Sequence, residues 1–523
     1  MGSVALEPSQ ETHGSGAANA SSHIRSYAPA TGALLGEIPV SSPEEVGATV
    51  ARARKAQAAW AVLPIDERVE RLLRFRDAIV ERADEIVEIV LKECGKPRHE
   101  ALVHEVMTIA DLATYYCRNA PRILAPQEIS LHFFVHRKSV VRYAPRGVVG
   151  IISPWNFPFS IPMGDVFAAL VTGSAAVVKP SELTPFTMMK AKEIYDSTGL
   201  PEDLFGVVQG YGATGSALID AGIQKLVFTG GVETGKRVAA ACGARLIPCV
   251  MELGGKAPLI ACADADLERT ARAIVYGGFA NAGQACVSVE RVYAHKDVHD
   301  PLVRRVRELT SELRVGDPSK DFFDVGAIIF SRQIDVAERC IEDALKKGAE
   351  LVVGGHRIPG PGQFFEPTVL ADCNDSMLVM NEETFGPVVP IQKVDSEEEA
   401  IALANRSRLG LNAYVFTSDR KRGQKIAEQV EAGSVVVNDV LVNYAIAEAP
   451  FGGIKDSGFG RVHGEDALRD MAEKRHVNYD RVSPPLADPT RHPYSAKTFH
   501  WLQRGLRLLF AGGGLVQRIG ELF

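Results

Sequence analysis

The chain has 523 residues, more than one ordinary hydrophobic core supports, so its length predicts two or three domains. Hydrophobic residues make up 46% of the chain and charged residues 24%, which places it among globular proteins rather than disordered or fibrous ones. The net charge of -7 gives no basis for general binding to nucleic acid. No run of about 18 apolar residues occurs, so we expect no membrane-spanning helix.

The eight cysteines lack the paired spacing of a zinc site, so we expect no metal centre. Free cysteines in this number indicate a reducing compartment, and we expect a cytoplasmic protein. Residues 1–24 lack the basic and apolar regions of a signal peptide and are expected to be a disordered lead-in. Seven cysteines are expected to be small buried hydrophobes: Cys94, Cys117, Cys242, Cys249, Cys262, Cys340 and Cys373.

Helical signals dominate the first part of the chain. Ser42 and Glu45 fit the N-cap and third position of a capping box and predict a helix start. A charged stretch with apolar residues at helical spacing predicts one long helix over residues 66–96. Residues 131–143 are β-rich.

From Gly147 on, short apolar runs alternate with helical segments of roughly 15 residues. Strands that alternate with helices predict parallel sheets and an α/β fold. The expected strands are 148–153, 175–179, 207–208 and 226–228, then 292–293, 350–353, 388–389 and 434–438 in a second alternation.

Cys286 closes the octapeptide that begins at Phe279, and it follows a glycine-softened turn. Glu252 ends an apolar run about thirty residues earlier and is followed by Leu253-Gly254-Gly255. A thiolate nucleophile with a carboxylate base is the equipment for covalent catalysis on a carbonyl group. A glutamate among apolar neighbours has a raised pKa, which suits a base near neutral pH.

These two motifs together resemble the aldehyde dehydrogenase superfamily, and the likeness extends over roughly residues 25–480. The resemblance implies an α/β protein with a Rossmann-like NAD-binding domain, an α/β catalytic domain and a small β oligomerisation element. It implies a homodimer or a homotetramer. The implied bounds are 25–130, 146–252 and 446–461 for the NAD-binding domain, 253–445 for the catalytic domain, and 131–145 with 462–482 for the oligomerisation element.

Two polar segments follow expected strands of the first alternation, where open α/β sheets bind ligands. Lys179 can donate to ribose hydroxyls and Glu182 can accept from them. The charge of Glu182 would also repel a 2′-phosphate, which favours NAD over NADP. An ordinary polar turn is the alternative for this segment. The other residues expected here are Ile152, Ser153, Pro154, Trp155 and Ser181.

The resemblance adds further cofactor residues. Gly212 and Gly215 lie in a GxGxxG pattern that is weak by itself, because glycines mark turns everywhere. The family instead binds the pyrophosphate at the helix that follows Phe228-Thr229-Gly230-Gly231, and Gly231 replaces its more frequent serine. We therefore expect weaker or more mobile cofactor binding. The remaining implied residues are Leu253, Gly254, Glu383 for the nicotinamide ribose and Phe385 for the ring.

The resemblance also implies a mechanism. Cys286 attacks the aldehyde carbon, and Asn156 with the main-chain N–H of Cys286 forms an oxyanion hole. Hydride transfer to NAD leaves a thioester, and Glu252 activates the water that releases the carboxylic acid. Relatives that transfer the acyl group to coenzyme A generally lack this glutamate, so its presence favours hydrolysis.

The sequence indicates the class of the aldehyde substrate only in part. The expected substrate loop, 443–448, contains no arginine for a substrate carboxylate, which disfavours succinic semialdehyde and favours a neutral apolar aldehyde. The segments 151–162 and 443–461 look most like the branch that acts on long-chain or apocarotenoid aldehydes. The same motifs are also compatible with an NADPH-dependent reductase of this fold, and with a non-catalytic protein that has kept the fold.

The last part of the chain differs in composition. Residues 483–495 contain four prolines and are expected to form an extended linker. Residues 496–523 are apolar and basic at helical spacing and predict an amphipathic tail, interrupted at Gly512-Gly513-Gly514. Such a tail either lies on a membrane surface or packs on the protein itself or a partner subunit.

Overall fold

The computed structural model describes residues 22–482, 490–510 and 512, and the chain divides into two compact units. The larger unit holds the chain up to Ala125 and Tyr143–Lys474, and the smaller one holds Pro126–Arg142 and the chain from Arg475 on. Of the expected disordered lead-in, residues 1–21 lie outside the described residues, but strand β1 already begins at His23. No helix in the described ranges is long and apolar enough to cross a membrane.

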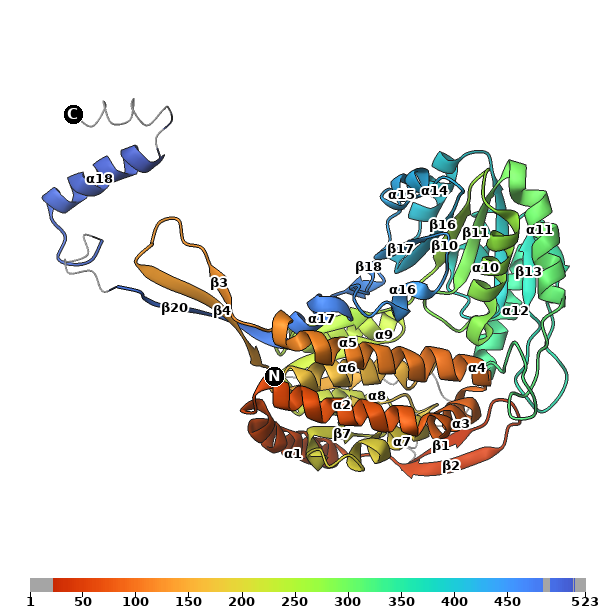
Figure 1. The fold of residues 1–523 in the computed structure, drawn as a ribbon. Coiled ribbons are helices and arrows are strands. Elements are labelled where there is room, and N and C mark those ends of the chain that lie inside the picture. Colours follow the sequence, from red (N-terminus) through yellow and green to blue (C-terminus); the bar gives the residue numbers. More distant parts are fainter. Residues whose placement is uncertain (1–21, 483–489, 511, 513–523) are drawn as a thin grey trace. The chain divides into compact units, whose positions relative to one another are not determined.

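The larger unit begins with the hairpin β1 (His23–Tyr27) and β2 (Leu34–Pro39), followed by helices (Figure 1). Helix α1 (Pro43–Ala61) starts as predicted: the Ser42 hydroxyl accepts from the Glu45 N–H at 3.2 Å, and the Glu45 carboxylate accepts from the Ser42 N–H at 2.7 Å. The prediction of one helix over 66–96 is wrong. Arg82, at φ -103° and ψ 24°, separates α2 (Ile65–Glu81) from α3 (Ala83–Cys94).

The next helix contains a π-helical segment. Helix α4 (Arg98–Glu100), the π-helix η1 (Ala101–Met107) and α5 (Thr108–Ile123) follow one another directly. π-helical segments occur frequently at functional sites. The buried face of α5 packs against α2 and α6.

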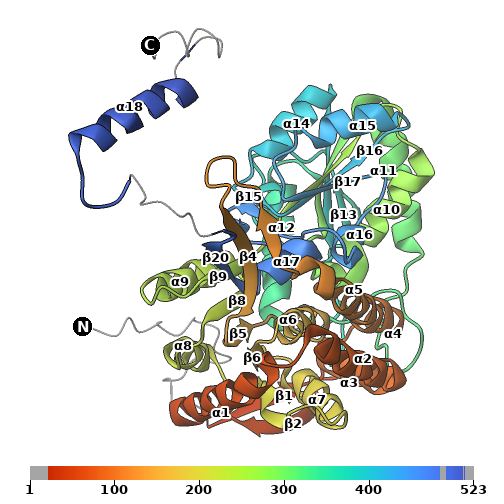
Figure 2. The ribbon, with the colours of Figure 1, turned by 60° about the vertical axis from the view of Figure 1, so that its left-hand side comes forward.

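The first sheet has the strand order β19-β9-β8-β5-β6-β7 and is parallel except for β19. All four strands predicted in this part are confirmed, although 207–208 only overlaps β7 at Val207. Helices α1, α6, α7 and α8 pack against its strands (Figure 2). The bounds are β5 (Val148–Ile152), α6 (Ser160–Val171), β6 (Ala175–Lys179), α7 (Pro185–Asp196), η2 (Glu202–Leu204), β7 (Phe205–Val207), α8 (Gly212–Asp220), β8 (Lys225–Thr229), α9 (Val232–Gly243), β9 (Cys249–Glu252) and β19 (Gly458–Phe459).

The second sheet has the order β12-β13-β14-β11-β10-β16-β17, and only its edge strand β12 is antiparallel. The second predicted alternation is therefore confirmed. Its bounds are β10 (Ala257–Ala261), α10 (Leu267–Phe279), η3 (Ala280–Gly283), β11 (Val289–His295), α11 (Lys296–Ser311), α12 (Ser331–Lys346), β12 (Glu350–Val353), β13 (Thr368–Ala371), α13 (Leu378–Asn381), β14 (Val388–Val394), α14 (Glu397–Asn405), β16 (Asn412–Phe416), α15 (Arg420–Ala427) and β17 (Ser434–Val437).

Four short elements complete the larger unit: β15 (Leu409–Gly410), α16 (Val442–Ala445), β18 (Ile454–Lys455) and α17 (Gly464–Asp470). Helix α17 packs against α5 and α6. Residues 462–474 lie in the larger unit, whereas the resemblance groups 462–482 with 131–145 as one element.

The smaller unit contains the sheet β20-β4-β3, formed by β20 (Ala472–Asp480), β4 (Arg137–Pro145) and β3 (Gln127–Ile129). Within the β-rich stretch of 131–143, strand structure begins only at Arg137. Residues 490–495 of the expected linker form neither helix nor strand, and residues 483–489 lie outside the described part. Helix α18 (Ala496–Phe510) matches the predicted tail up to the glycines, beyond which the chain is not described.

Candidate active site

The loop between η3 and β11 carries Cys286. Asn281 and Ala282 adopt left-handed conformations, with φ of 51° and 55°, and Gly283 follows at φ 73°. Gly255 lies against this loop so closely that a Cβ atom there would come within 2.2 Å of the Cys286 carbonyl oxygen. The tight turn leaves the thiol partly exposed, and Cys286 lines three separate cavities.

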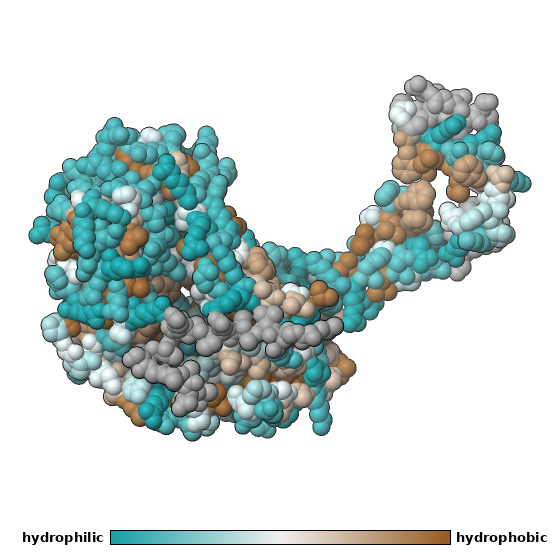
Figure 3. All heavy atoms as spheres, turned by 180° about the vertical axis from the view of Figure 1, so that it is seen from behind, coloured by the Kyte–Doolittle hydropathy of each residue, from teal (hydrophilic) through white to brown (hydrophobic). Residues whose placement is uncertain are grey.

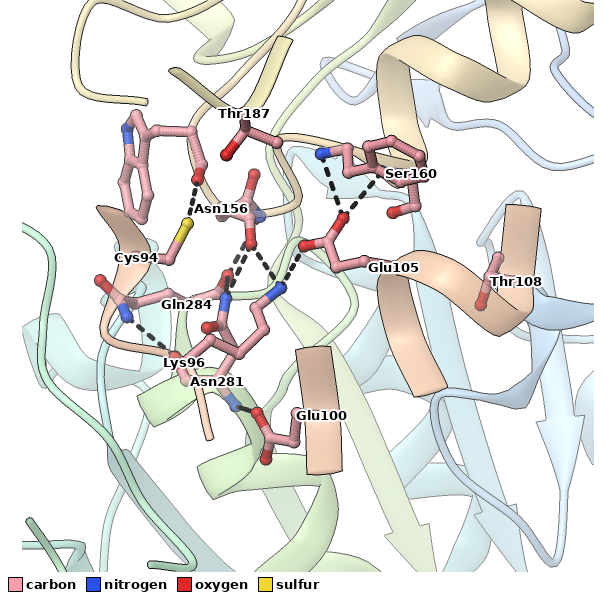
Figure 4. A network of polar contacts seen from close by, with 12 residues as sticks. Cys94, Lys96, Glu100, Glu105, Thr108, Asn156, Ser160, Thr187, Asn281 and Gln284 are labelled. Atoms are coloured by element: carbon pink, nitrogen blue, oxygen red, sulfur yellow. Dashed lines mark hydrogen bonds and ion pairs between the residues drawn. The ribbon is translucent and has the colours of Figure 1, made fainter. Parts of the chain in front are cut away.

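Asn156 lies beside this loop, just after β5. Its side-chain amide donates to the main-chain carbonyl of Gln284 at 3.0 Å. The main-chain carbonyl of Asn156 in turn accepts from the side-chain amide of Asn281 at 3.0 Å (Figure 4). These two contacts hold the proposed oxyanion donor next to the proposed nucleophile.

A buried ion pair, which the sequence did not indicate, contacts the segment that contains Asn156. Lys96 and Glu105 are 2.6 Å apart, and both side chains are inaccessible to solvent. Lys96 also donates to the Asn156 carbonyl at 2.9 Å (Figure 4). Glu105 accepts from the N–H groups of Phe159 and Ser160 at the start of α6, at 3.2 and 2.7 Å. The pair therefore fixes the segment that carries Asn156 at both ends.

Glu252 is the last residue of β9 and is 4% exposed. Neither of its carboxylate oxygens has a hydrogen-bond partner among the described residues. Burial raises the pKa of Glu252 well above its ordinary value, Asp165 raises it further, and Arg461 opposes this shift. A carboxyl group in this state is available to exchange a proton with a water molecule in the cavity.

The Cys286 thiol has a raised pKa as well. Burial raises it to about 12, and the nearby carboxyl groups of Glu252 and Glu383 add to the shift. Main-chain N–H groups of Cys286 and Val287 oppose it. The raised pKa favours the thiol form at neutral pH, so a base or a positive charge is needed to activate the sulfur.

One cavity of about 340 Å³ leads from Cys286 to the carboxyl ends of the first sheet. Glu383 lies over Gly254, where a Cβ atom would come within 2.4 Å of its carboxylate. Glu383 also accepts from the Gly255 N–H at 2.8 Å, and burial raises its pKa to about 8. Of the predicted cofactor residues, the cavity is lined by Pro154, Trp155, Thr229, Gly230, Gly231, Leu253, Gly254, Glu383 and Phe385.

A second buried ion pair orders the loop that carries Phe385. Lys256 and Glu290 are 2.6 Å apart, and Glu290 accepts from the N–H groups of Thr384 and Phe385 at 2.8 and 3.1 Å. Phe385, at φ 49°, meets the Trp155 ring edge to face at 5.4 Å. The loop thereby presents its aromatic ring to the cavity wall.

A second group of predicted cofactor residues contains Ile152, Lys179, Glu182 and Gly215. Lys179 is 3.5 Å from Glu182, and a Cβ atom on Gly215 would lie 3.4 Å from Ile152 and 3.9 Å from Lys179. Ser153 has a buried hydroxyl without a partner in the described part of the chain. Ser181 is buried, Gly212 begins α8, and the Phe228 ring lies against Gly230.

The two groups fit a nicotinamide dinucleotide. Gly231 is the N-cap of α9, it lacks a side-chain cap, and the space above it is open. Helix N-termini of this kind bind phosphate through free N–H groups. The unpartnered Ser153 hydroxyl and the Lys179–Glu182 pair supply polar groups for a ribose. Arg332 and Gln333 also line the cavity and were missed, because no pattern marks them in the sequence.

A further cavity of about 270 Å³ reaches Cys286 and is mostly apolar in its lining. Of the predicted substrate loop, Tyr444 and Ala445 line it, whereas Asn443 is buried and donates to Asn412 at 3.0 Å. His104 of the π-helix and Tyr276 of α10 also line it and contact each other at 2.8 Å. The sequence did not indicate these two residues, because they meet only through the packing of distant helices.

The described residues contain no cluster of three or more metal-ligating side chains. Six cysteines are buried as predicted, but Cys249 is half-buried. A hydrogen bond from Cys242 lowers the pKa of Cys249 to about 7. Cys249 lines none of the three cavities at Cys286.

A sequence model of the Aldehyde dehydrogenase family matches residues 17–477. The chain belongs to this family. The enzyme is 37% identical to a 4,4'-diapolycopene aldehyde oxidase of a Methylomonas species, over 95% of this chain and 93% of that protein. It is 40% identical to a putative NADP(+) succinate-semialdehyde dehydrogenase of Mycolicibacterium smegmatis, over 87% and 89% of the two chains.

Solved structures agree with the family assignment. The NAD+ complex of an aldehyde dehydrogenase from Bacillus cereus superimposes on this aldehyde dehydrogenase with a TM-score of 0.84. The two chains are 32% identical, and the match covers 88% of this chain and 94% of that one. The fold is thus the aldehyde dehydrogenase fold, and the reaction is the NAD(P)-linked oxidation of an aldehyde to its acid.

Proposed function

We propose that this aldehyde dehydrogenase oxidises an apolar, long-chain aldehyde to the carboxylic acid and uses NAD. The observation that carries the proposal is the lining of the 270 Å³ cavity, which includes neither lysine nor arginine. Asp439 is the one acidic residue in this lining. Burial lowers the pKa of His104 to about 3, so that its imidazole is neutral. A substrate carboxylate would meet no cation there and would be repelled by Asp439.

The residues act in a defined order. The Cys286 thiol gives up its proton to water, and the sulfur bonds to the aldehyde carbon while an electron pair of the carbonyl bond moves to its oxygen. The resulting alkoxide lies against the Asn156 amide and the main-chain N–H of Cys286. NAD, when bound, supplies the hydride acceptor and a positively charged ring. The product on Cys286 is a thioester. Glu252 then removes a proton from water, the water oxygen bonds to the acyl carbon, and the electron pair of the C–S bond returns to sulfur.

The preference for NAD rests on Glu182. Its carboxylate follows β6 beside Lys179, in the second group of cofactor residues. A carboxylate at the ribose accepts from both hydroxyls and repels a 2′-phosphate. We therefore expect Glu182→Ala to lower the ratio of kcat/KM with NAD to kcat/KM with NADP. Equal use of the two cofactors by the wild type would contradict this role of Glu182.

Succinic semialdehyde is the alternative substrate, because relatives with that assignment are as similar as the diapolycopene aldehyde oxidase. The test is a panel of aldehydes of rising chain length, with succinic semialdehyde included, assayed with NAD and with NADP. We expect kcat/KM to rise with chain length and to be lowest for succinic semialdehyde. A maximum at succinic semialdehyde would overturn the assignment, and NADPH-dependent reduction alone would favour a reductase.

We also propose that α18 contacts an anionic membrane surface. The helix contains no acidic residue and carries Lys497, Arg504 and Arg507. Apolar residues lie at the surface of the smaller unit (Figure 3), and those exposed on α18 are Phe499, Trp501, Leu502, Leu506, Leu509 and Phe510. An aromatic, basic amphipathic helix of this kind binds at the headgroup level of anionic bilayers.

The membrane proposal is tested by removing residues 483–523. We expect the shortened enzyme to keep its activity on short aldehydes and to lose sedimentation with phosphatidylserine vesicles. Phosphatidylcholine vesicles are the control for charge. Equal sedimentation of both forms would overturn the proposal and indicate that α18 packs on protein.

A homodimer or homotetramer is proposed to form through the sheet β20-β4-β3. Strands β20 and β3 are its two edges, and exposed edges pair readily with another chain. Ile129, Val477 and Tyr479 on these edges are more than one-third exposed. Light scattering after size exclusion measures the mass, and a monomer would contradict the proposal.

A further inference from the structure

A third cavity at Cys286 contains a carboxyl group and an imidazole that the reaction described above does not use. It has a volume of about 20 Å³, enough for one water molecule. Asp165 and His463 line it together with Cys286 and Glu252. The four side chains come from α6, the segment before α17, the nucleophile loop and β9, so only the fold brings them together.

Asp165 is unusual for its position. It lies in the middle of α6, whose twelve residues are all buried, and it is the one ionisable residue of that helix. Asp165 is 5% exposed and has no hydrogen-bond partner within the described ranges. A buried carboxyl group without a partner destabilises the fold, and such groups call for a functional explanation.

Charged and titratable groups from several elements surround Asp165. Lys225 on β8 is the cation that favours its ionised form, and Lys225 is itself paired with Asp470 at 2.6 Å. The other titratable groups near Asp165 are Glu252 on β9, Tyr116 on α5, Tyr444 on α16 and His463, which is at φ 61°. Burial raises the pKa of Asp165 to about 7, and that of Glu252 lies well above its ordinary value.

We propose that Asp165 is the proton acceptor that returns Glu252 to its carboxylate form after each hydrolysis of the acyl-enzyme. This inference rests on the proposed function, because it concerns the second half of that reaction. When Glu252 has taken a proton from the hydrolytic water, it is a neutral acid and cannot serve the next turnover. Asp165, which holds the shared proton while Glu252 is ionised, releases that proton to solvent, and its carboxylate then accepts the Glu252 proton through the water of the small cavity.

Two physical arguments support this transfer. Two carboxyl groups that share a small cavity resist simultaneous ionisation, so that the pair holds one proton over a wide pH range. Burial raises the pKa of both groups, so that each holds a proton at a higher pH than an exposed carboxyl group does. His463, whose buried Nδ1 has no hydrogen-bond partner among the described residues, is a further polar group on the cavity wall.

The test uses p-nitrophenyl acetate, which acetylates Cys286 without any cofactor or aldehyde. The Cys286 sulfur displaces p-nitrophenolate and forms an acetyl thioester, which water then hydrolyses. Asp165→Asn should keep a burst of about one p-nitrophenolate per active site, and its subsequent steady rate should fall at least tenfold. Formate in the buffer should restore the steady rate by carrying the proton, and Asp165→Glu should retain it.

Three controls make the result decisive. Cys286→Ala gives the background rate, and thermal unfolding shows that each variant is folded. Asp317→Asn removes another buried aspartate outside the cavity and should behave as the wild type. An unchanged steady rate in Asp165→Asn, or a burst that falls in parallel with it, would overturn the proposal. The aldehyde panel tests the proposed function separately, because ester hydrolysis requires neither NAD nor an aldehyde.

Discussion

The side-chain amide of Asn156 donates to the main-chain carbonyl of Gln284, two residues before the nucleophile, at 3.0 Å. This bond joins the loop after β5 to the loop before β11, and thus one sheet to the other. The proposed oxyanion donor, Asn156, and the proposed nucleophile, Cys286, are therefore positioned by the same contact.

Replacement of Asn156 by alanine should lower kcat by about 10²–10³-fold, the usual effect of removing one oxyanion donor.

The ion pair between Lys96 and Glu105 should affect stability instead. Lys96→Met leaves Glu105 buried without its cation and should lower the free energy of unfolding by about 3–5 kcal/mol. Steady-state kinetics and urea unfolding separate the two effects, and a large loss of stability in Asn156→Ala would contradict this division.

Cys249, and not Cys286, should be the first cysteine that iodoacetamide modifies at pH 7.5. The pKa of Cys249 is lowered to about 7 and that of Cys286 is raised to about 12, so the thiolate fraction is larger at Cys249. Peptide mapping should show this first modification without loss of activity. In a Cys249→Ser background, activity should be lost in step with slow labelling of Cys286. Loss of activity in proportion to labelling at Cys249 would refute the assignment of the nucleophile.

Glu252→Gln should allow acylation and hydride transfer but not hydrolysis. Stopped-flow measurements should show a burst of NADH near one per active site, followed by slow turnover. In the wild type, the rate of hydrolysis should increase as pH rises through the raised pKa of Glu252, because only the carboxylate accepts a proton. Normal steady turnover in the variant would show that another group acts as the base.

Asp165→Asn should stabilise the protein increasingly as pH rises. The pKa of Asp165 is about 7 in the folded state and about 3.9 in an unfolded chain, so the folded state binds more protons between these values. The contribution of Asp165 is fully present below pH 4 and is lost as pH rises through 7, at about 1.4 kcal/mol per pKa unit. Asparagine does not titrate, so the difference in Tm between variant and wild type should grow from pH 5 to pH 8. A constant difference would contradict the shifted pKa.

The sequence predicted most of the sheets but only part of the site. Apolar runs and glycines sufficed for the parallel strands, and the motifs around Cys286 and Glu252 identified residues that share one cavity. Asp165, His104 and Tyr276 were missed, because each looks like an ordinary residue of its helix and acquires its surroundings only from packing. The long helix predicted over 66–96 was wrong because periodic spacing continues through Arg82, where the backbone turns.

The π-helix between α4 and α5 limits which deletions this helix can accept. A π-helical turn contains one residue more than an α-helical turn, and one residue turns a helix by about 100°. The π-helix itself supplies Val103 and His104 to the 270 Å³ cavity at Cys286, and α5 after it buries Leu112 and Tyr116 in the core. Deleting a single residue from η1 would rotate one of these faces away from its neighbours. The extra residue thus sets the angle between two faces of one continuous helix, so that one face lines the cavity and the other packs in the core.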